Sequence, residues 1–328
     1  MLTEFAFTPA VFDQEAHEDK ADWRVQLKEI LRALAPRTGV SAVIVADLYA
    51  GVWSQDVLTL LKEVDDPKLK QVCQDIISVL PSRLVHRDVA ADFPESDLGW
   101  CNEALASHVV EPIERIVSIS KTKESVENPI VRTLEELEDG GFWSGIDSVA
   151  SPDPILSAQI PKLRTLCLHS EWIGYCNPYG ATSEVNFTIE FLKSALNLPS
   201  QFSNLKIEAH FAKSDVDVNE LQRLQSRCAN YLRNEVGAPA GTHLSCNVFF
   251  WSKLLERSIV GGVYTEDGKG NVRKKPKWGV SMTHVARNEA AGGENHKWRL
   301  LDRREIAEPF NNVLDDGLSS RPTFDTAF

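Results

Sequence analysis

The chain has 328 residues, enough for about two domains of ordinary size, and its 43% hydrophobic and 25% charged residues are typical of a globular protein. Its formal net charge of −12 repels nucleic acid at long range. This composition argues against a stand-alone DNA-binding protein, because any phosphate site must come from a local basic patch or from a partner.

The six cysteines form no close Cys-x-x-Cys pair and show no spacing typical of a zinc site. We therefore expect buried thiols, no metal and no cofactor. The first thirteen residues lack a basic leader and are interrupted by Glu4 and Pro9. No apolar run reaches the roughly 20 residues that cross a bilayer. These features predict a cytoplasmic protein without a membrane partner.

The first 120 residues are expected to form a mainly helical domain. Residues 1–13 are apolar and predicted to be extended, while the apolar spacing of residues 21–34, 56–63, 67–80 and 97–119 predicts helices, the last of them kinked or broken at Pro112. Residues 40–48 fit either a short buried strand or the start of a helix, because periodicity cannot separate the two in so short a run.

Residues 121–158 are acidic, interrupted by glycine and proline, and poor in periodic segments. This change of composition predicts a domain boundary with a docked acidic linker. The C-terminal domain, residues 159–328, alternates in pattern. Strands are expected over 163–175, 205–211 and from 245, and helices over 184–196, 217–234 and 303–313. The fold class predicted for the chain is α/β, with a mixed sheet in this second domain.

Residues 257–285 read as two apolar strands joined by a polar, basic hairpin. The first strand contains the pair Gly261 and Gly262. Two glycines within a strand predict a bulge or a place where another backbone or a ligand comes close.

Three short motifs carry a resemblance to a known superfamily: Asn177-Pro178-Tyr179, Glu208-Ala209-His210, and Leu254-Leu255-Glu256-Arg257 ahead of the glycine strand. Their order resembles the C-terminal part of the phospholipase D-like superfamily, in the branch similar to MIT C-terminal domains of bacterial defence-island proteins. In that branch the motifs read Asp-Pro-Tyr, Glu-Ile-His and Leu-His-Asp-Arg. The likeness spans about residues 160–285 and implies a phospholipase D-like α/β domain.

The departure from that pattern concerns catalysis. Phospholipase D-type chemistry requires a histidine that attacks phosphorus and a neighbouring cation that stabilises the phosphoryl oxygens. Leu255 stands at the nucleophile position and has no nucleophilic group. The resemblance therefore implies a degenerate, non-hydrolytic domain without catalytic residues.

Phosphate binding is the part of this chemistry that the residues still permit. Arg257 and the hairpin cations are candidate phosphate ligands if they share one groove, namely Arg273, Lys274, Lys275 and Lys277. Further residues are candidates for a remnant of the site: Asn177, Glu208, His210, Glu256 and His284. The alternatives are a solvated hairpin tip, an ordinary Glu256–Arg257 ion pair, and a surface pair of Glu208 with His210.

The residues and the resemblance together suggest three functions, and the defence context comes from the resemblance alone. The leading hypothesis is a non-catalytic subunit of a bacterial defence or nucleic-acid-processing complex, which binds a protein partner and a phosphate backbone of DNA or RNA. The alternative is an active phosphodiesterase or nuclease with a rearranged or oligomer-completed site. A third is a sensing module that binds a nucleotide at Arg257.

Overall fold

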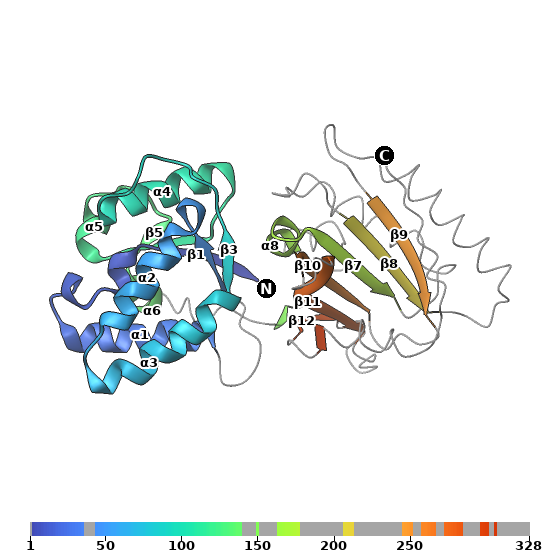
Figure 1. Cartoon of the computed structure of the whole chain (residues 1–328), viewed down its shortest axis with the longest axis horizontal. Coiled ribbons are helices and arrows are strands. Elements are labelled where there is room, and N and C mark those ends of the chain that lie inside the picture. Colours follow the sequence, from blue (N-terminus) through green and yellow to red (C-terminus); the bar gives the residue numbers. More distant parts are fainter. Residues whose placement is uncertain are drawn as a thin grey trace, which may run out of the picture. The chain divides into compact units, whose positions relative to one another are not determined.

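The computed structural model describes residues 2–35, 43–139, 149–150, 163–177, 206–212, 245–251, 257–266, 272–284, 296–301 and 305–306. The chain forms two compact units, of which the first is Leu2–Ser148 and the second contains Val149–Phe328. Each unit has a sheet of its own (Figure 1). Helices and strands occur in both units, which confirms the α/β class.

The first unit is built on five parallel strands: β1 (Thr3–Phe7), β2 (Val43–Asp47), β3 (Leu84–His86), β4 (Arg115–Val117) and β5 (Val131–Arg132). Their order in the sheet is β3-β2-β1-β4-β5. The chain builds outward from β1 to β3 on one side and then crosses to β4 on the other. The strand order therefore reverses between β1 and β4, the place where open parallel sheets bind ligands.

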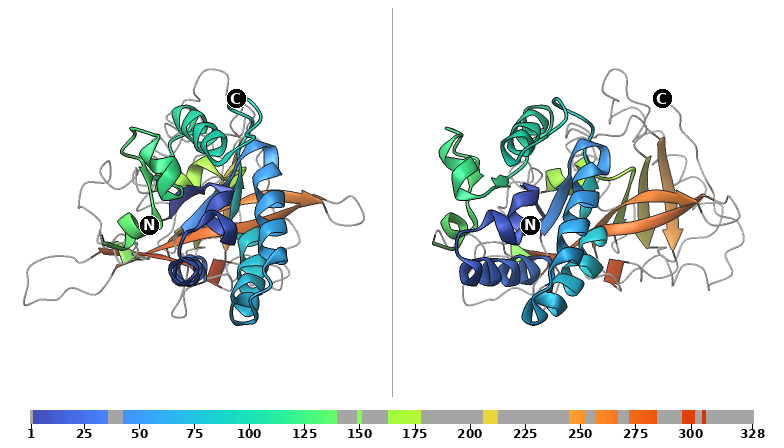
Figure 2. Two further views of the ribbon diagram at one scale, coloured as in Figure 1. Left: turned by 90° about the vertical axis from the view of Figure 1, so that its left-hand side faces the viewer. Right: turned by 60° about the vertical axis from the view of Figure 1, so that its left-hand side comes forward.

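Helices cover both faces of this sheet (Figures 1 and 2). On one face lie α1 (Lys20–Leu34), α2 (Val52–Glu63) and α3 (Pro67–Val79), and on the other α4 (Asp97–Val110) and α5 (Ser120–Glu124); α6 (Leu134–Asp139) follows β5. The Asp19 side chain caps α1 by accepting from the Ala21 and Asp22 amides. Trp23, Leu27 and Ile30 of α1 are fully buried, as the helical spacing of these residues predicts.

A buried ion pair ties β1 to the segment after β3. The Arg87 guanidinium donates to both carboxylate oxygens of Glu4, at 2.9 and 2.7 Å, and to Glu111 Oε2 at 2.9 Å. Arg87 is 3% exposed and Glu4 is 2% exposed. Both charges of the pair are therefore removed from water. Glu4 is compensated by Arg87, and Arg87 is compensated by Glu4 and Glu111 together.

The predicted helices of the first unit are present, and residues 40–48 prove to contain a strand, β2. Helices make up most of the regular structure of this unit, as expected, but they surround a parallel sheet. Two expectations need correction. Residues 97–119 are not one kinked helix, because α4 ends before Pro112 and β4 follows. The expected linker, residues 121–158, contains α5, β5 and α6, and β5 pairs with β4.

The second unit contains a mixed sheet, as predicted. Its strands are β6 (Val149–Ala150), β7 (Trp172–Asn177), β8 (Lys206–Ala212), β9 (Ser245–Trp251), β10 (Ser258–Glu266), β11 (Val272–His284) and β12 (His296–Leu300). They lie in the order β6-β12-β11-β10-β7-β8-β9. Strands β7, β8 and β9 are parallel, and the other neighbours are antiparallel.

Some expectations for the second unit fall outside the described residues. The helices expected over 184–196 and 217–234 lie there entirely, and the one expected over 303–313 lies there for the most part. The strand expected over 163–175 begins later than predicted. A short helix, α8 (Arg164–Leu168), occupies the first part of that range, and β7 starts only at Trp172.

The glycine pair marks a close backbone approach, as the sequence predicts. The register between β10 and β11 shifts between Gly261 and Gly262. A Cβ atom on Gly262 would overlap the Lys275 carbonyl group, and one on Gly261 would overlap the Ser170 hydroxyl. Glycine is therefore required here by the space beside each Cα atom.

We expect Gly262→Ala to lower the free energy of unfolding of the second unit by about 1–3 kcal/mol, because the added methyl group meets backbone that cannot rotate away. Denaturant unfolding of the full chain measures this. Glu266→Ala, at an exposed position of the same strand, serves as control and should change the value by less than about 0.5 kcal/mol. Equal stability of Gly262→Ala and the parent would contradict the close approach.

Candidate functional site

Strand register places several polar residues on one side of the second sheet. Glu208 and His210 of β8 are the register partners of Gly174 and Cys176 of β7. Cys176 in turn pairs with Ser258 of β10. Directly paired residues share a side of a sheet, and alternate residues along a strand return to it. We call this side the Glu208 face.

Glu208 is buried between a histidine and a lysine. Its side chain is 3% exposed and that of His210 is 4% exposed. The Glu208 Oε2 atom lies 3.5 Å from His210 Nε2, and its Oε1 atom accepts a hydrogen bond from the Lys274 ammonium group. Lys274 reaches it from β11, where it is the register partner of Tyr264. The sequence motif Glu-x-His and one lysine of the hairpin therefore meet in a single cluster.

Electrostatics keep the Glu208 carboxylate ionised. Burial raises the pKa of Glu208, but the hydrogen bond and charge of His210, together with Lys274, outweigh burial and bring this pKa to about 2. At neutral pH the cluster then contains one anion and the Lys274 cation, and a protonated His210 adds a second positive charge. The cluster is thus neutral or positive within a strongly acidic protein.

The thiol beside this cluster is inert. Burial raises the pKa of Cys176 to about 12. It outweighs the hydrogen bond with Ser258, which lowers this pKa, and the Glu208 charge adds a smaller increase. Only the thiolate is a nucleophile, so a thiol with so high a pKa takes no part in nucleophilic chemistry at neutral pH. Cys176 and Ser258 form polar packing beside Glu208.

A basic and aromatic patch adjoins the cluster on the same face. We define it by four residues that register brings together: Trp172, Lys206, Tyr264 and Lys274. The Nζ atom of Lys206 lies 4.7 Å from the centre of the Tyr264 ring, and that of Lys274 lies 5.5 Å from the centre of the Trp172 ring. Burial, Glu208 and Glu171 raise the pKa of Tyr264, so its phenol stays neutral.

Three residues of this basic–aromatic patch, Trp172, Lys206 and Tyr264, were missed by the sequence analysis. A signal for Lys206 exists, because it precedes Glu208 and His210 at the spacing of two that puts residues on one side of a strand. Tyr264 could be found only from its pairing with Lys274 across the hairpin. The exposed Lys206 and the partly exposed Tyr264 give the patch its accessible surface.

The hairpin cations do not share one groove. The sequence analysis had made this a condition for their role as phosphate ligands, so they cannot act together as one site. Lys275 pairs with Val263, one residue along from the Lys274–Tyr264 pair, so it lies on the opposite side of the sheet. Lys277 lies at the register shift, with its Nζ atom 5.3 Å from the centre of the Trp278 ring. Burial and then Lys275 lower the pKa of Lys277.

Asn177 and Arg257 are both buried, at 0% and 7% exposure. Asn177 follows Cys176, and Arg257 precedes Ser258, so strand alternation places both on the side opposite Glu208. The Glu208–His210 pair is also buried and is not the surface pair offered as an alternative. Glu256 lies outside the described residues. Arg273 and His284 belong to β11, but their side chains lie outside the described part of the structure.

Within the described ranges, no three histidine, cysteine, aspartate or glutamate side chains come close enough together to hold a metal ion. None of the helices in those ranges has the length and apolar character needed to cross a membrane.

No protein-family model matches the chain, and no curated protein matches its sequence. Two solved structures resemble it weakly. TrmBL2, an archaeal chromatin protein with a novel mode of DNA binding, is 13% identical, with a TM-score of 0.26, over 93% of this chain and 96% of its own. Glucose-6-phosphate dehydrogenase is 8% identical, with a TM-score of 0.19, over 95% and 83%. Likeness at this level assigns neither fold nor function.

Proposed function

We propose that this chain is a non-catalytic subunit of a bacterial defence or nucleic-acid-processing complex, acting in the cytoplasm, and that its second unit binds a phosphate backbone while a protein partner supplies the chemistry. One observation carries the proposal. Lys206 and Lys274 stand with Tyr264 on one face of the sheet, beside the Glu208–His210 pair.

This arrangement suits single-stranded DNA or RNA. Proteins that bind single strands without sequence preference combine cations that follow the phosphates with aromatic rings on which bases stack. Lys206 and Lys274 supply the cations, and the partly exposed Tyr264 supplies a ring. Because the whole chain carries a net charge of −12, binding should be weak at long range and depend on these local contacts.

The test is the salt dependence of binding of a labelled single strand, measured by fluorescence anisotropy. The variant Lys206→Ala/Lys274→Ala should bind more weakly, and the slope of log affinity against log salt should fall by about 1.4, at roughly 0.7 per lost phosphate contact. The matched control is Lys62→Ala/Lys70→Ala, which removes the same charge from exposed helix positions of the first unit. If the control variant loses as much affinity for the single strand as Lys206→Ala/Lys274→Ala does, the basic–aromatic patch is not the binding site.

A second candidate function rests on the pairing of His210 with a carboxylate. A histidine oriented by a carboxylate is what a nucleophilic or general-base histidine requires, and Lys274 beside it could stabilise phosphoryl oxygens. The chain would then be a phosphodiesterase or nuclease with a rearranged site. Its signature is turnover of bis-p-nitrophenyl phosphate that survives purification and disappears in His210→Ala; the leading proposal expects no turnover in either protein.

A further inference from the structure

Hydrophobic side chains are exposed along one short stretch of the first unit, residues 89–110. Among the residues that the structure describes, seven large hydrophobic side chains are exposed, and five of them belong to this stretch. The five, each between 40% and 83% exposed, are Val89, Phe93, Leu98, Val109 and Val110. Single exposed hydrophobic residues are ordinary on a protein surface, whereas a group of them marks an interaction surface.

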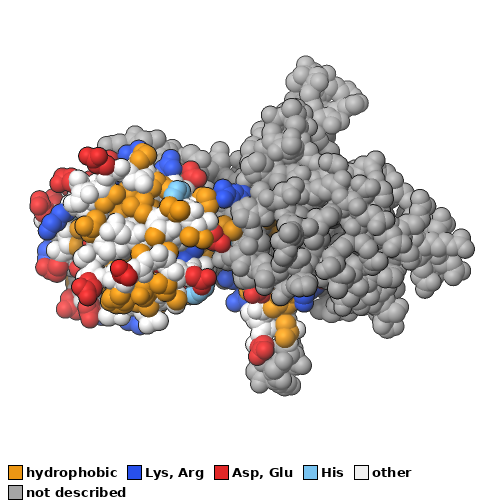
Figure 3. Space-filling model, turned by 90° about the horizontal axis from the view of Figure 1, so that it is seen from above, with side chains coloured by type: hydrophobic (Ala, Val, Ile, Leu, Met, Phe, Trp, Pro, Cys, Tyr) orange, Lys and Arg blue, Asp and Glu red, His pale blue; other side chains and the backbone are white. Residues whose placement is uncertain are grey.

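Helix α4 turns an uncharged side toward the solvent. At 3.6 residues per turn, Leu98, Leu105 and Val109 fall on one side of this helix, and Asn102 is the polar residue among them. We call Leu98, Leu105 and Val109 the α4 stripe. Figure 3 shows the first unit from above, with hydrophobic side chains across the middle of the face and acidic ones along its outer margin. A surface helix usually presents charged or polar residues outward, so this side of α4 is suited to packing against a partner.

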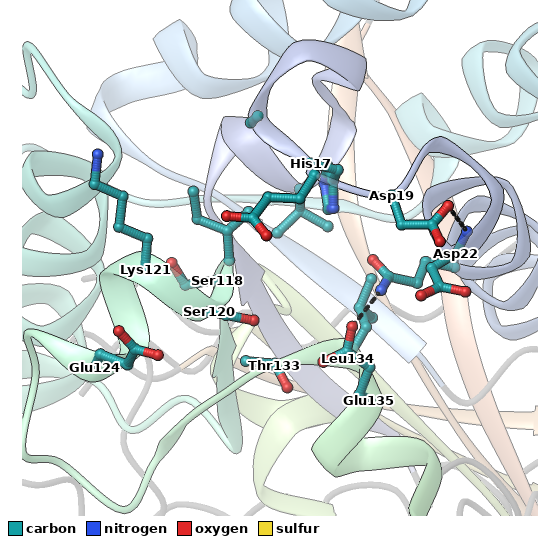
Figure 4. A pocket seen from close by; sticks show the side chains of 15 residues that line it. His17, Asp19, Asp22, Ser118, Ser120, Lys121, Glu124, Thr133, Leu134 and Glu135 are labelled. Atoms are coloured by element: carbon teal, nitrogen blue, oxygen red, sulfur yellow. Dashed lines mark hydrogen bonds between the residues drawn. The ribbon is translucent and has the colours of Figure 1, made fainter.

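Both ends of α4 are tied to the segments around β4, which fixes the α4 stripe in place. At the start of the helix, Asp97 Oδ2 accepts a hydrogen bond from Ser118 Oγ at 2.8 Å, and Ser118 follows β4. After its end, the Ile113 amide donates to His108 Nδ1 at 3.0 Å. Ser118 also lines a pocket of about 510 Å³ at the carboxyl edge of the sheet, whose lining residues all come from outside α4 (Figure 4). The pocket and the α4 stripe are therefore separate features.

The loop before α4 is held against the helix. Glu103 of α4 is fully buried, and its carboxylate accepts hydrogen bonds from the Ala90 and Ala91 amides at 3.0 and 2.6 Å. A Cβ atom on Gly99 would lie 3.0 Å from Pro94 Cα, so the loop also touches the first turn of the helix. The loop and the start of α4 therefore form one continuous surface.

Phe93 is the aromatic side chain that this loop presents. It is 59% exposed, yet its ring meets the Tyr49 ring edge to face, with 5.5 Å between the centroids. Rigid aromatic side chains are the usual anchors of protein interfaces. A side chain that is already held in place loses little conformational freedom when a partner binds, so Phe93 is suited to be such an anchor.

Carboxylates edge the hydrophobic surface on the side of the loop. Asp88, Asp92 and Glu95 are exposed. None of the three forms an ion pair with a described lysine or arginine, and Asp88 lies 3.5 Å from His86. On the side of α5 the charges are mixed, because that helix contributes two lysines and one glutamate. An apolar surface edged with unpaired carboxylates is complementary to an apolar surface edged with lysine or arginine.

We propose that the α4 stripe, with Val89 and Phe93, is the docking surface for a basic amphipathic helix of a protein partner. The apolar side of that helix packs along the α4 stripe, as helices pack through their side-chain ridges, and its cationic residues meet the loop carboxylates. A second copy of the chain fits less well, because it would bring like charges together and each copy carries a net charge of −12. The proposal names the contact surface for the protein partner of the proposed function and rests on that part of it alone.

The experiment is a fluorescence anisotropy titration, at physiological ionic strength, of a labelled synthetic helix with leucine on one side and lysine on the other. No nucleic acid is present, so failure here leaves the test of phosphate binding unaffected. The variant Leu98→Ser/Val109→Ser should bind the peptide about tenfold more weakly than the parent, because it removes apolar area from the contact. The control Val25→Ser/Val272→Ser, at exposed valines outside this surface, should bind within about twofold of the parent.

A second pair of variants tests the charges. Asp92→Asn/Glu95→Gln should bind the peptide about threefold more weakly than the parent and lose part of the salt dependence. Glu63→Gln/Asp75→Asn removes the same charge from exposed positions of α2 and α3 and should stay within about twofold of the parent.

Three results would overturn the proposal. The first is equal affinity of Leu98→Ser/Val109→Ser and its control for the peptide. The second is equal binding of a scrambled peptide whose leucines share no side, because charge alone would then explain the attraction. The third is a dimer of the parent in sedimentation velocity that Leu98→Ser/Val109→Ser abolishes, because a second copy of the chain would then cover this surface.

Discussion

Arg87→Ala should lower the free energy of unfolding of the first unit by about 3–5 kcal/mol, the usual cost of leaving one partner of a buried ion pair uncompensated. The Glu4 carboxylate, 2% exposed, loses both of its hydrogen bonds from Arg87 in this variant. The carbonyl oxygen of Glu111 also loses a donor. Denaturant unfolding of the full chain, followed by amide hydrogen exchange of peptides from the first unit, measures the loss.

Two comparisons separate burial of charge from simple loss of a contact. Arg115→Ala removes an ion pair with Glu114 whose side chains are 34% and 55% exposed, and it should cost less than about 1 kcal/mol. The double variant Arg87→Met/Glu4→Met removes both buried charges and should be more stable than Arg87→Ala. An Arg87→Ala protein that unfolds like the parent would show that the pair is not buried.

Glu208→Gln should destabilise the second unit by about 3 kcal/mol, because the amide cannot compensate the Lys274 ammonium and a protonated His210. The pH dependence identifies the cause. The pKa of Glu208 falls from 4.5 to about 2 on folding, so its contribution is complete above about pH 4.5 and is lost as the pH falls toward 2. The parent should lose about 3 kcal/mol more than Glu208→Gln over this window.

The control for this prediction is Glu266→Gln, an exposed carboxylate on β10. It should leave both the stability and its pH profile close to those of the parent. If the parent and Glu208→Gln lose stability in parallel between about pH 4.5 and 2, the Glu208 carboxylate is not held by His210 and Lys274.

The sequence predicted what depends on local spacing. The Glu208-x-His210 motif has the period of a strand, and the structure places both side chains on one face of β8. The Gly261–Gly262 pair predicted a close approach, and it occurs at the shift in register with β11. In each case the information lies within a few consecutive residues, where periodicity and glycine geometry are informative.

What depends on pairing between distant strands could not be predicted. Nothing within the hairpin sequence says that Lys274 rather than Lys275 faces Glu208, because the bulge sets that register. Strands β3 and β4 have three residues each and β5 has two, too few to show alternation. Without those strands no carboxyl edge was expected in the first unit, and the pocket that it forms went unnoticed.

The most direct test of the central claim, that the basic–aromatic patch holds a single-stranded phosphate backbone without cleaving it, is photocrosslinking to a strand containing 5-bromouridine. Peptide mapping should find the adduct at Tyr264, decreasing with added salt and absent from Lys206→Ala/Lys274→Ala, while the strand stays intact on a denaturing gel. Adducts confined to the first unit, the absence of a salt-sensitive adduct, or cleavage that disappears in His210→Ala would each contradict the account.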